Sequence, residues 1–225
     1  MTINAIIFGS TGMIGQGLVL ECLENPQVES ILLINRQPCG MSHKKLKEII
    51  HQDFFDLSSI ENEFKNKNTC FFCLGISAVG LDEPAYDKIT FDLTINVAKT
   101  LLKINPDHTF CYVSGAGTDS SEKGNAMWAR VKGKTENALL AMPFKKSYMF
   151  RPGYIQPTRG IKSKTKWYNI VYIVFKPMYY LLKRFKNLVT DTDRMAKAMI
   201  NAVAFGSDKK ILGVREINIL SRNSH

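Results

Sequence analysis

Residue types that build metal centres and covalent cross-links are scarce in this sequence. Its 225 residues include five cysteines and four histidines. An odd number of cysteines scattered through apolar segments indicates reduced thiols rather than a disulfide framework. Cys70 and Cys73 stand three apart in the strand-like run CFFCLG, where alternation directs their side chains to opposite faces. We therefore expect neither a redox or zinc pair at these cysteines nor any metal site.

Segments that would direct the chain to or through a membrane are also missing. The first ten residues, MTINAIIFGS, have no basic region and their apolar run ends at a glycine, which predicts neither a secretory signal nor a membrane anchor. The apolar run at residues 167–182 contains one lysine and one proline. As a helix it would reach about 24 Å, short of the roughly 30 Å of a bilayer's hydrocarbon core. We expect a cytoplasmic protein without a membrane-spanning helix.

Basic residues are few in the first half of the chain and abundant in the second. Residues 1–115 hold 9 Lys and Arg against 13 Asp and Glu, whereas residues 116–225 hold 21 against 7. The net charge of +10 suggests an anionic partner, but no helix-turn-helix, zinc finger or RNP-like strand is present, so nucleic acid is not expected. Basic residues border the apolar run over residues 162–186. This segment is expected to cover a substrate cleft, with peripheral membrane contact, apolar-substrate contact or a protein interface as alternatives.

Apolar strand-like runs alternate with helical stretches in the first half, which is typical of an α/β fold with a parallel sheet covered on both faces. We predict one domain with three parts, namely a core over residues 1–160, an apolar helical lid or insertion over 161–189, and a helix and strand that return to the core over 190–225. The predicted strands are Ile3–Phe8, Ser30–Ile34, Glu48–His51, Thr69–Leu74, Thr109–Val113, Ser147–Phe150 and Glu216–Leu220. The predicted helices are Gly12–Glu24, Ser58–Glu63, Tyr86–Ile104, Ala126–Ala141 and a last one from an N-cap at Thr190 or Thr192 to Ala204.

Three glycines follow the first predicted strand and open the first predicted helix, in the sequence IIFGSTGMIGQG. In a dinucleotide-binding turn one glycine permits the tight turn, one admits the pyrophosphate and one allows close helix packing, while the helix N-terminus supplies amides. The spacing is G-x-x-G-x-x-G rather than G-x-G-x-x-G, and a purely steric turn is the alternative. We predict a dinucleotide site with contacts from Gly9, Ser10, Thr11, Gly12, Met13, Ile14 and Gly15.

The end of the second predicted strand favours NADP(H) over NAD(H). NAD-binding sites carry an acid about 20 residues after the turn, whereas this chain has Asn35 and Arg36 there. A guanidinium can hold a 2′-phosphate in fork geometry, although an ordinary surface arginine is the alternative. Asp53, at the end of the third predicted strand, is placed to bond an adenine amino group or simply to begin a loop.

Seven motifs together resemble the atypical short-chain dehydrogenase/reductases, a group similar to NAD-dependent epimerases and dehydratases, and in particular their Tat-interacting-protein-like subgroup. They are GSTGMIG, LINR, QDFFDL, FFCLGIS, YVSGAG, RVKGKTE and FRPGYI, in order over about residues 3–160. The resemblance implies a Rossmann-like, doubly wound parallel sheet with a C-terminal helical elaboration on the substrate side. It also implies a bound nicotinamide dinucleotide, with further contacts from Leu74, Gly75, Lys132, Pro152, Gly153 and Tyr154.

The resemblance further implies a catalytic group of Ser114, Lys132 and Asn96, but its tyrosine is missing. That tyrosine should stand four residues before the lysine, where this chain has Trp128. An indole cannot exchange a proton with a carbonyl oxygen near neutral pH. Either Tyr154 or Thr118 replaces the phenol, in a reductase or epimerase acting on a carbonyl or sugar-type substrate, or the chain is a non-catalytic NADP(H) redox sensor.

Overall fold

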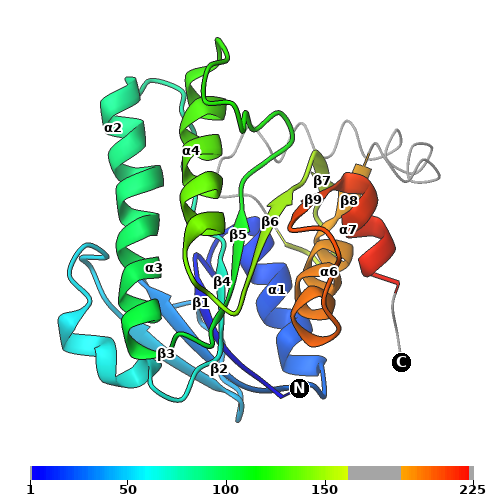
Figure 1. Ribbon diagram of the computed structural model, residues 1–225. Helices are drawn as coiled ribbons and strands as arrows, with labels where there is room; N and C mark the ends of the chain where they lie inside the picture. Colours follow the sequence, from blue (N-terminus) through cyan, green and yellow to red (C-terminus); the bar gives the residue numbers. More distant parts are fainter. Residues whose placement is uncertain (1, 162–188, 223–225) are drawn as a thin grey trace.

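A seven-stranded, entirely parallel sheet forms the centre of the molecule (Figure 1). The computed structural model describes residues 2–161 and 189–222. Within them the strand order is β3-β2-β1-β4-β5-β6-β9, which is the doubly wound Rossmann-like arrangement expected. A separate pair of parallel strands, β7 and β8, lies beside it. The strands are β1 (Ile3–Phe8), β2 (Val28–Asn35), β3 (Leu46–Ile50), β4 (Thr69–Phe72), β5 (Thr109–Val113), β6 (Lys146–Arg151), β7 (Tyr154–Gln156), β8 (Val189–Asp191) and β9 (Ile211–Gly213).

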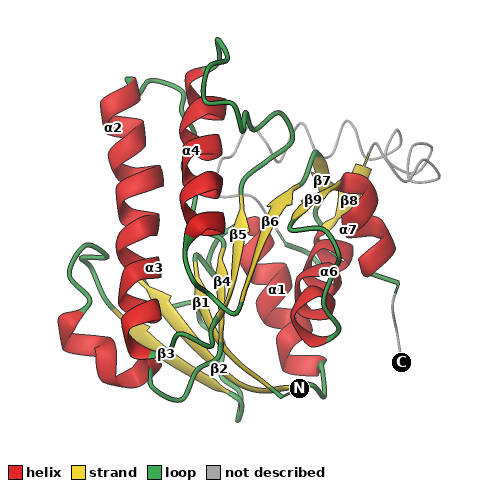
Figure 2. Ribbon diagram, viewed as in Figure 1, coloured by secondary structure: helices red, strands yellow, loops and turns green. Residues whose placement is uncertain are grey.

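Helices cover both faces of the sheet (Figure 2), because alternate residues of each central strand are apolar on both sides. In β1, Ala5 and Ile7 pack into one core and Ile6 and Phe8 into the other. The first core includes α1 and α6, and the second includes α3 and the short 3₁₀ helix η1. The helices are α1 (Met13–Glu24), η1 (Ser58–Phe64), α2 (Glu83–Asp87), the π-helical turn η2 (Lys88–Asp92), α3 (Leu93–Ile104), α4 (Met127–Ala141), α6 (Thr192–Ala204) and α7 (Val214–Leu220).

Two expectations about the C-terminal part are wrong. The predicted strand Glu216–Leu220 is part of helix α7, whose buried residues Val214, Ile217 and Leu220 recur at the spacing of one helical face. The edge strand lies earlier, at β9. The N-cap of α6 is neither threonine but Asp191, whose carboxylate accepts a hydrogen bond from the Arg194 amide at 2.7 Å.

The predicted apolar lid and the basic stretch over residues 162–186, with its suggested membrane contact, lie outside the described residues. Across the part that the structure describes, no helix is long and apolar enough to cross a membrane. The three-part division of the chain therefore stays a prediction. All five cysteines are free, and Cys70 and Cys73 face opposite cores of the sheet.

Candidate dinucleotide site

In the glycine turn between β1 and α1, backbone segments lie so close together that side chains at Gly9 and Gly15 would clash with them. Gly9 has a φ of +81°, and a Cβ there would lie 2.7 Å from the Leu74 nitrogen. A Cβ on Gly15 would lie 2.1 Å from the Gly9 oxygen. The turn stands where the strand order reverses, with β2 on one side of β1 and β4 on the other. No acidic residue occupies the first turn of α1, so its positive end remains available to an anion.

A cavity of about 450 Å³ opens beside this turn. Arg36 is exposed at its rim and forms no ion pair with any described residue. The fit of a dinucleotide is supported by the combination of free backbone space, a helix N-terminus and this cation. The lining residues are Gly9, Thr11, Ile34, Asn35, Arg36, Gln37, Gln52, Phe54 and Leu74.

Asn35 and Ser10 secure the turn to β2 instead of facing the cavity freely. The buried Ser10 hydroxyl donates to Asn35 Oδ1 at 2.8 Å, and Asn35 Nδ2 donates to Glu48 Oε1 at 2.6 Å. The same Glu48 oxygen accepts from the Cys39 amide at 2.9 Å. Sequence reasoning missed Glu48, which lies in β3 between Lys47 and the apolar pair Ile49 and Ile50. Its carboxylate already holds the loop that follows Arg36.

A second cavity, of about 270 Å³, shares part of its wall with the first and extends to α4. It brings Arg36, Asp53, Leu74, Gly75 and Lys132 together, as the predicted cofactor contacts would require. The Asp53 carboxylate also accepts from the Phe55 amide at 2.8 Å, the loop role that was its alternative. Sequence reasoning missed the buried cavity residues from α2, η2 and β5, which are Tyr86, Thr90 and Tyr112.

Lys132 lies on α4 with its ammonium directed at the loop after β5. Its Nζ donates to the Ser114 carbonyl oxygen at 2.5 Å. Burial lowers the pKa of Lys132 to about 8, while the negative charge of Glu136 acts in the opposite direction. Lys132 is therefore a cation held at the inner wall of the second cavity.

The Ser114 hydroxyl, expected to orient a substrate, and the Thr118 hydroxyl, a candidate to replace the phenol, are both engaged inside the protein. Ser114 is 6% exposed, and its Oγ donates to Glu136 Oε1 at 2.5 Å, with the Phe150 carbonyl oxygen 3.1 Å away. The buried Thr118 hydroxyl donates to the Gly115 carbonyl oxygen at 2.8 Å. A hydroxyl has one proton to donate, so in this arrangement neither group can donate to a substrate oxygen.

Asn96, Trp128 and Tyr154, which the sequence singled out, also have contacts within the protein. Asn96 donates its amide to the Phe54 and Phe55 carbonyl oxygens at 3.2 and 2.9 Å, so α3 directs it to the loop after β3. Trp128 packs its indole over Gly117, where a Cβ would lie 3.3 Å from the ring. The Tyr154 phenol donates to Gln156 Oε1 at 2.8 Å, and burial raises the pKa of Tyr154.

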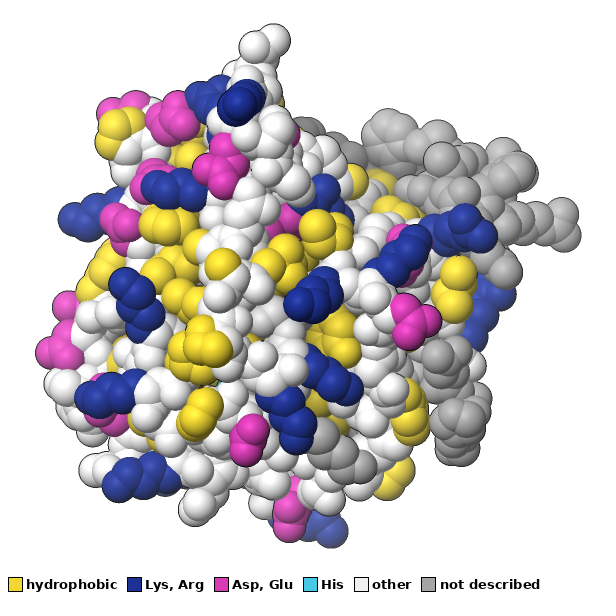
Figure 3. Space-filling model, in the orientation of Figure 1, with side chains coloured by type: hydrophobic (Ala, Val, Ile, Leu, Met, Phe, Trp, Pro, Cys, Tyr) yellow, Lys and Arg dark blue, Asp and Glu magenta, His cyan; other side chains and the backbone are white. Residues whose placement is uncertain are grey.

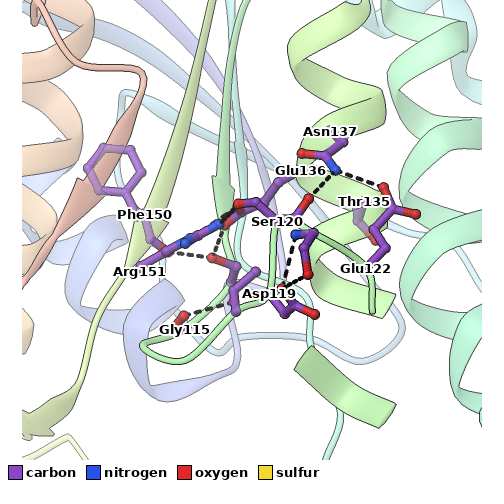
Figure 4. Close-up of polar contacts among 12 residues, drawn as sticks. Gly115, Asp119, Ser120, Glu122, Thr135, Glu136, Asn137, Phe150 and Arg151 are labelled. Carbon is purple, nitrogen blue, oxygen red and sulfur yellow. Dashed lines mark hydrogen bonds and ion pairs between the residues drawn. The ribbon is translucent and has the colours of Figure 1, made fainter. Parts of the chain in front are cut away.

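A buried ion pair behind Ser114 was not found from sequence. The fully buried Glu136 of α4 and Arg151 at the end of β6 form a two-pronged pair, and Arg151 also donates to the Ser120 hydroxyl at 2.5 Å (Figure 4). The i, i+4 spacing places Glu136 beside Lys132 on one helix face, but it does not identify Arg151 as the partner. This cluster joins α4, β6 and the loop after β5.

The chain is similar in sequence to several curated proteins, although no family model matches it. It is 27% identical over 178 residues to "Protein FMP52, mitochondrial" of Debaryomyces hansenii, covering 75% of this chain and 76% of that protein. It is 28% identical to the Saccharomyces cerevisiae protein of the same name, covering 72% and 69%. Protein HTATIP2 of Rattus norvegicus is 23% identical, covering 73% and 67%. The expected cytoplasmic location is therefore wrong by comparison, because these fungal relatives are named mitochondrial.

Solved structures with the same fold confirm the expected architecture. WbmH of Bordetella bronchiseptica in complex with NAD+ superposes with a TM-score of 0.68 at 16% identity, covering 94% of this chain and 75% of that one. A short chain dehydrogenase of Burkholderia cenocepacia in complex with NADP gives 0.65 at 13% identity, covering 96% and 92%. A short chain dehydrogenase/reductase family oxidoreductase of Burkholderia thailandensis gives 0.68 at 15%, covering 97% and 93%. The resemblance noted in the sequence is confirmed at the level of the fold.

Proposed function

We propose that this chain, which has the fold of the short-chain dehydrogenases, binds NADP(H) beside the turn at residues 9–15. Backbone amides of the turn and the positive end of α1 would hold the pyrophosphate. Asp53, Leu74, Gly75 and Lys132 would contact the rest of the cofactor from the second cavity, and the segment of Pro152, Gly153 and Tyr154 would lie near the nicotinamide. When bound, the nicotinamide supplies hydride-transfer chemistry.

The preference for NADP(H) rests on one observation, the exposed Arg36 at the rim of the cavity with no carboxylate at the end of β2. Asn35 stands where an acid would bond a ribose 2′-hydroxyl, and its amide is already engaged by Ser10 and Glu48. A 2′-phosphate placed there would gain a charge-assisted, two-pronged bond from Arg36. NAD(H) would gain no such contact.

The geometry supports cofactor binding more strongly than conventional carbonyl reduction. Trp128 has no ionisable proton near neutral pH, and the protons of Ser114, Thr118 and Tyr154 are donated to protein acceptors. Loss of a general acid typically costs about 10² to 10⁴ in rate without abolishing binding. We therefore assign a non-catalytic NADP(H)-responsive role first.

A reductase or epimerase acting on a carbonyl or sugar-type substrate is the second candidate. Lys132 favours it, because an ammonium with a pKa of about 8 is close to the pH at which it could exchange a proton. Substitution of Trp128, described below, separates the two candidates.

The cofactor assignment is tested by titrating the purified chain with NADPH and NADH and following ligand fluorescence or heat. We expect NADPH to bind more tightly, and Arg36→Met to weaken NADPH binding by about 10- to 100-fold because a charge-assisted bond is lost, while NADH binding stays the same. Arg215→Met, on α7 and outside the lining of the two cavities, is the matched control. Tighter binding of NADH, or binding of neither cofactor, would refute the proposal.

A further inference from the structure

Glu136 is a charged group sealed inside the protein, and both of its oxygens are engaged. Oε1 accepts from Ser114 Oγ at 2.5 Å and from Arg151 Nε at 3.0 Å. Oε2 accepts from Arg151 Nε at 3.1 Å and from the terminal guanidinium nitrogen Nη2. A buried carboxylate is retained only at a considerable desolvation cost, which its partners must offset. A serine and an arginine from two different elements are therefore bound to one point on α4.

The Glu136–Arg151 pair holds the loop over residues 114–120 at both ends, because Glu136 accepts from Ser114 at its start and Arg151 donates to Ser120 at its end; Figure 4 shows the pair and Ser120. Ser114 begins this loop, and its carbonyl oxygen accepts from Lys132 Nζ. Ser120 lies farther along the loop and accepts from Arg151. Between them, the Ala116 amide donates to the Pro152 carbonyl oxygen at 2.7 Å. Removing the carboxylate would release the serine and the arginine that hold the loop in place.

We propose that Glu136 is the positioning residue of this site: it fixes the loop over residues 114–120 from the interior and thereby fixes the Lys132 ammonium at the cavity wall. The inference rests on the proposed function only in that Lys132 is the cofactor contact being positioned. Glu136 itself touches neither cavity, so it acts through Ser114 and Arg151. Ser114 thus serves as an anchor rather than as the group that orients a substrate.

The charge of Glu136 has a second effect, because it lies one helical turn from Lys132. Burial disfavours the protonated ammonium, and the carboxylate favours it. The other charged or titratable groups around the cavity that Lys132 lines are Arg36, Asp53, Tyr86 and Tyr112. Arg36 and Asp53 are exposed to solvent, which screens them, and the two phenols are neutral near pH 8. Glu136 is therefore the charge to change.

The test is the titration of Lys132 in the cofactor-free protein, followed by NMR of isotopically labelled lysine side chains and assigned with Lys132→Arg. Glu136→Gln keeps the side-chain volume and removes the charge. We expect its Lys132 midpoint to lie at lower pH than that of the parent, and Glu136→Asp to restore it toward the parent value. Glu83→Gln is the control. Glu83 of α2 pairs with Arg130, which lies on α4 like Lys132, at 2.5 Å. This substitution should leave the Lys132 midpoint unchanged.

If Glu136→Gln does not fold, Glu136→Met/Arg151→Met removes both charges, a change that buried ion pairs often tolerate. Loss of the Arg151 cation acts in the opposite direction, so the midpoint should fall by less than in Glu136→Gln. NADPH binding is then measured at pH 6 and pH 8, where we expect the folded variant to lose roughly fivefold in affinity at pH 8 relative to pH 6, beyond the change in the parent. An unchanged Lys132 midpoint in the folded variants would overturn the inference. Failure of the parent to bind NADPH would instead refute the proposed function and leave the midpoint test standing.

Discussion

At the scale of single residues, Trp128 is the position that distinguishes the two proposed functions. It occupies the helix position one turn before Lys132, with its ring against Gly117, whose φ of +87° carries the loop close beneath the indole. The indole N–H can donate a hydrogen bond but cannot serve as an acid near neutral pH. In the proposed site, Trp128 would therefore provide aromatic packing without the proton transfer of a phenol.

Trp128→Tyr should therefore create an activity. We expect the variant to oxidise NADPH in the presence of a panel of carbonyl compounds, at rates about 10² to 10⁴ above the parent, because the phenol supplies the missing general acid. The measurement is the loss of NADPH absorbance, and Trp128→Phe is the control that changes ring size without adding a hydroxyl. Turnover by the parent at the rate of the Tyr variant would favour the reductase or epimerase reading instead.

Lys132 should also contribute to the pH dependence of the free energy of unfolding. Its pKa falls from the 10.5 of an exposed lysine to about 8 in the folded protein. Between these values the unfolded chain binds more protons than the folded one, so this group makes the free energy of unfolding rise with pH. At pH 7 both states are protonated and the folded protein bears the full penalty, about 3 kcal/mol.

Lys132→Met should therefore gain stability relative to the parent at pH 7, and that gain should shrink as the pH rises from 8 toward 10.5. Urea unfolding at several pH values measures it, and the buried thiols and phenols common to both proteins cancel in the difference. Lys99→Met, at an exposed position of α3, should show no such trend. A difference independent of pH would mean that Lys132 titrates as an exposed lysine.

At the scale of elements, Arg159 links the segment after β7 to two helices. Its guanidinium pairs with Glu21 and Glu24 of α1 at 3.0 and 2.9 Å and with Asp193 of α6 at 3.0 Å. The residue takes a left-handed φ of 51°, uncommon for a non-glycine residue, so the ion pairs are made at some conformational cost. Three carboxylates sharing one partly buried guanidinium form a network rather than an isolated surface pair.

Arg159→Gln should lower the free energy of unfolding by about 1 to 2 kcal/mol, because three partners lose their cation. The loss should diminish at high salt, which screens the network in the parent. Lys103→Gln removes an exposed pair with Glu61 at 3.7 Å and should change stability by less than about 0.5 kcal/mol. Equal effects of the two substitutions, measured by urea unfolding, would show that the network adds nothing beyond a surface pair.

The elements themselves were predictable wherever their signals were local. The apolar run of β1, the glycines of the turn and the periodicity of α3 each specify one element from consecutive residues. β7 and β8 have three residues each and pair with one another. Because this pairing is between segments far apart in the chain, it cannot be predicted from consecutive residues. For α7, the predicted strand at Glu216–Leu220 was wrong, because the buried Val214, Ile217 and Leu220 recur at the spacing of one helical face.

At the scale of the whole molecule, some site residues are predictable from their position in the chain, and others are fixed only by tertiary packing. Gly9, Arg36 and Asp53 follow strands and are found from position in the chain, because parallel strands bring their carboxyl ends to one edge. The pairs Asn35–Glu48 and Glu136–Arg151 join different elements across 13 and 15 residues. Such partners are fixed by the packed sheet and helices, and the sequence alone offers no pairing rule for them.

The fold places the described basic side chains of the second half at separate positions. On the face shown in Figure 3, described lysine and arginine side chains are interspersed with acidic and apolar ones and do not form a continuous basic groove. Arg151 and Arg159 are paired with carboxylates, and Lys132 is buried at the cavity wall. Part of the cationic excess is therefore used in holding elements together.

The free cysteines make the centre of the sheet accessible to kinetic measurement. Cys22, Cys70 and Cys111 are fully buried, and burial raises the pKa of each thiol, which suppresses the reactive thiolate. Cys70 and Cys111 lie on the neighbouring strands β4 and β5. A thiol reagent reaches these sulfurs only when the strands separate from their covering helices, so the rate of alkylation counts opening events at the middle of the molecule. The rate at which the native thiols are alkylated therefore measures how often the sheet opens near the glycine turn, without any added label.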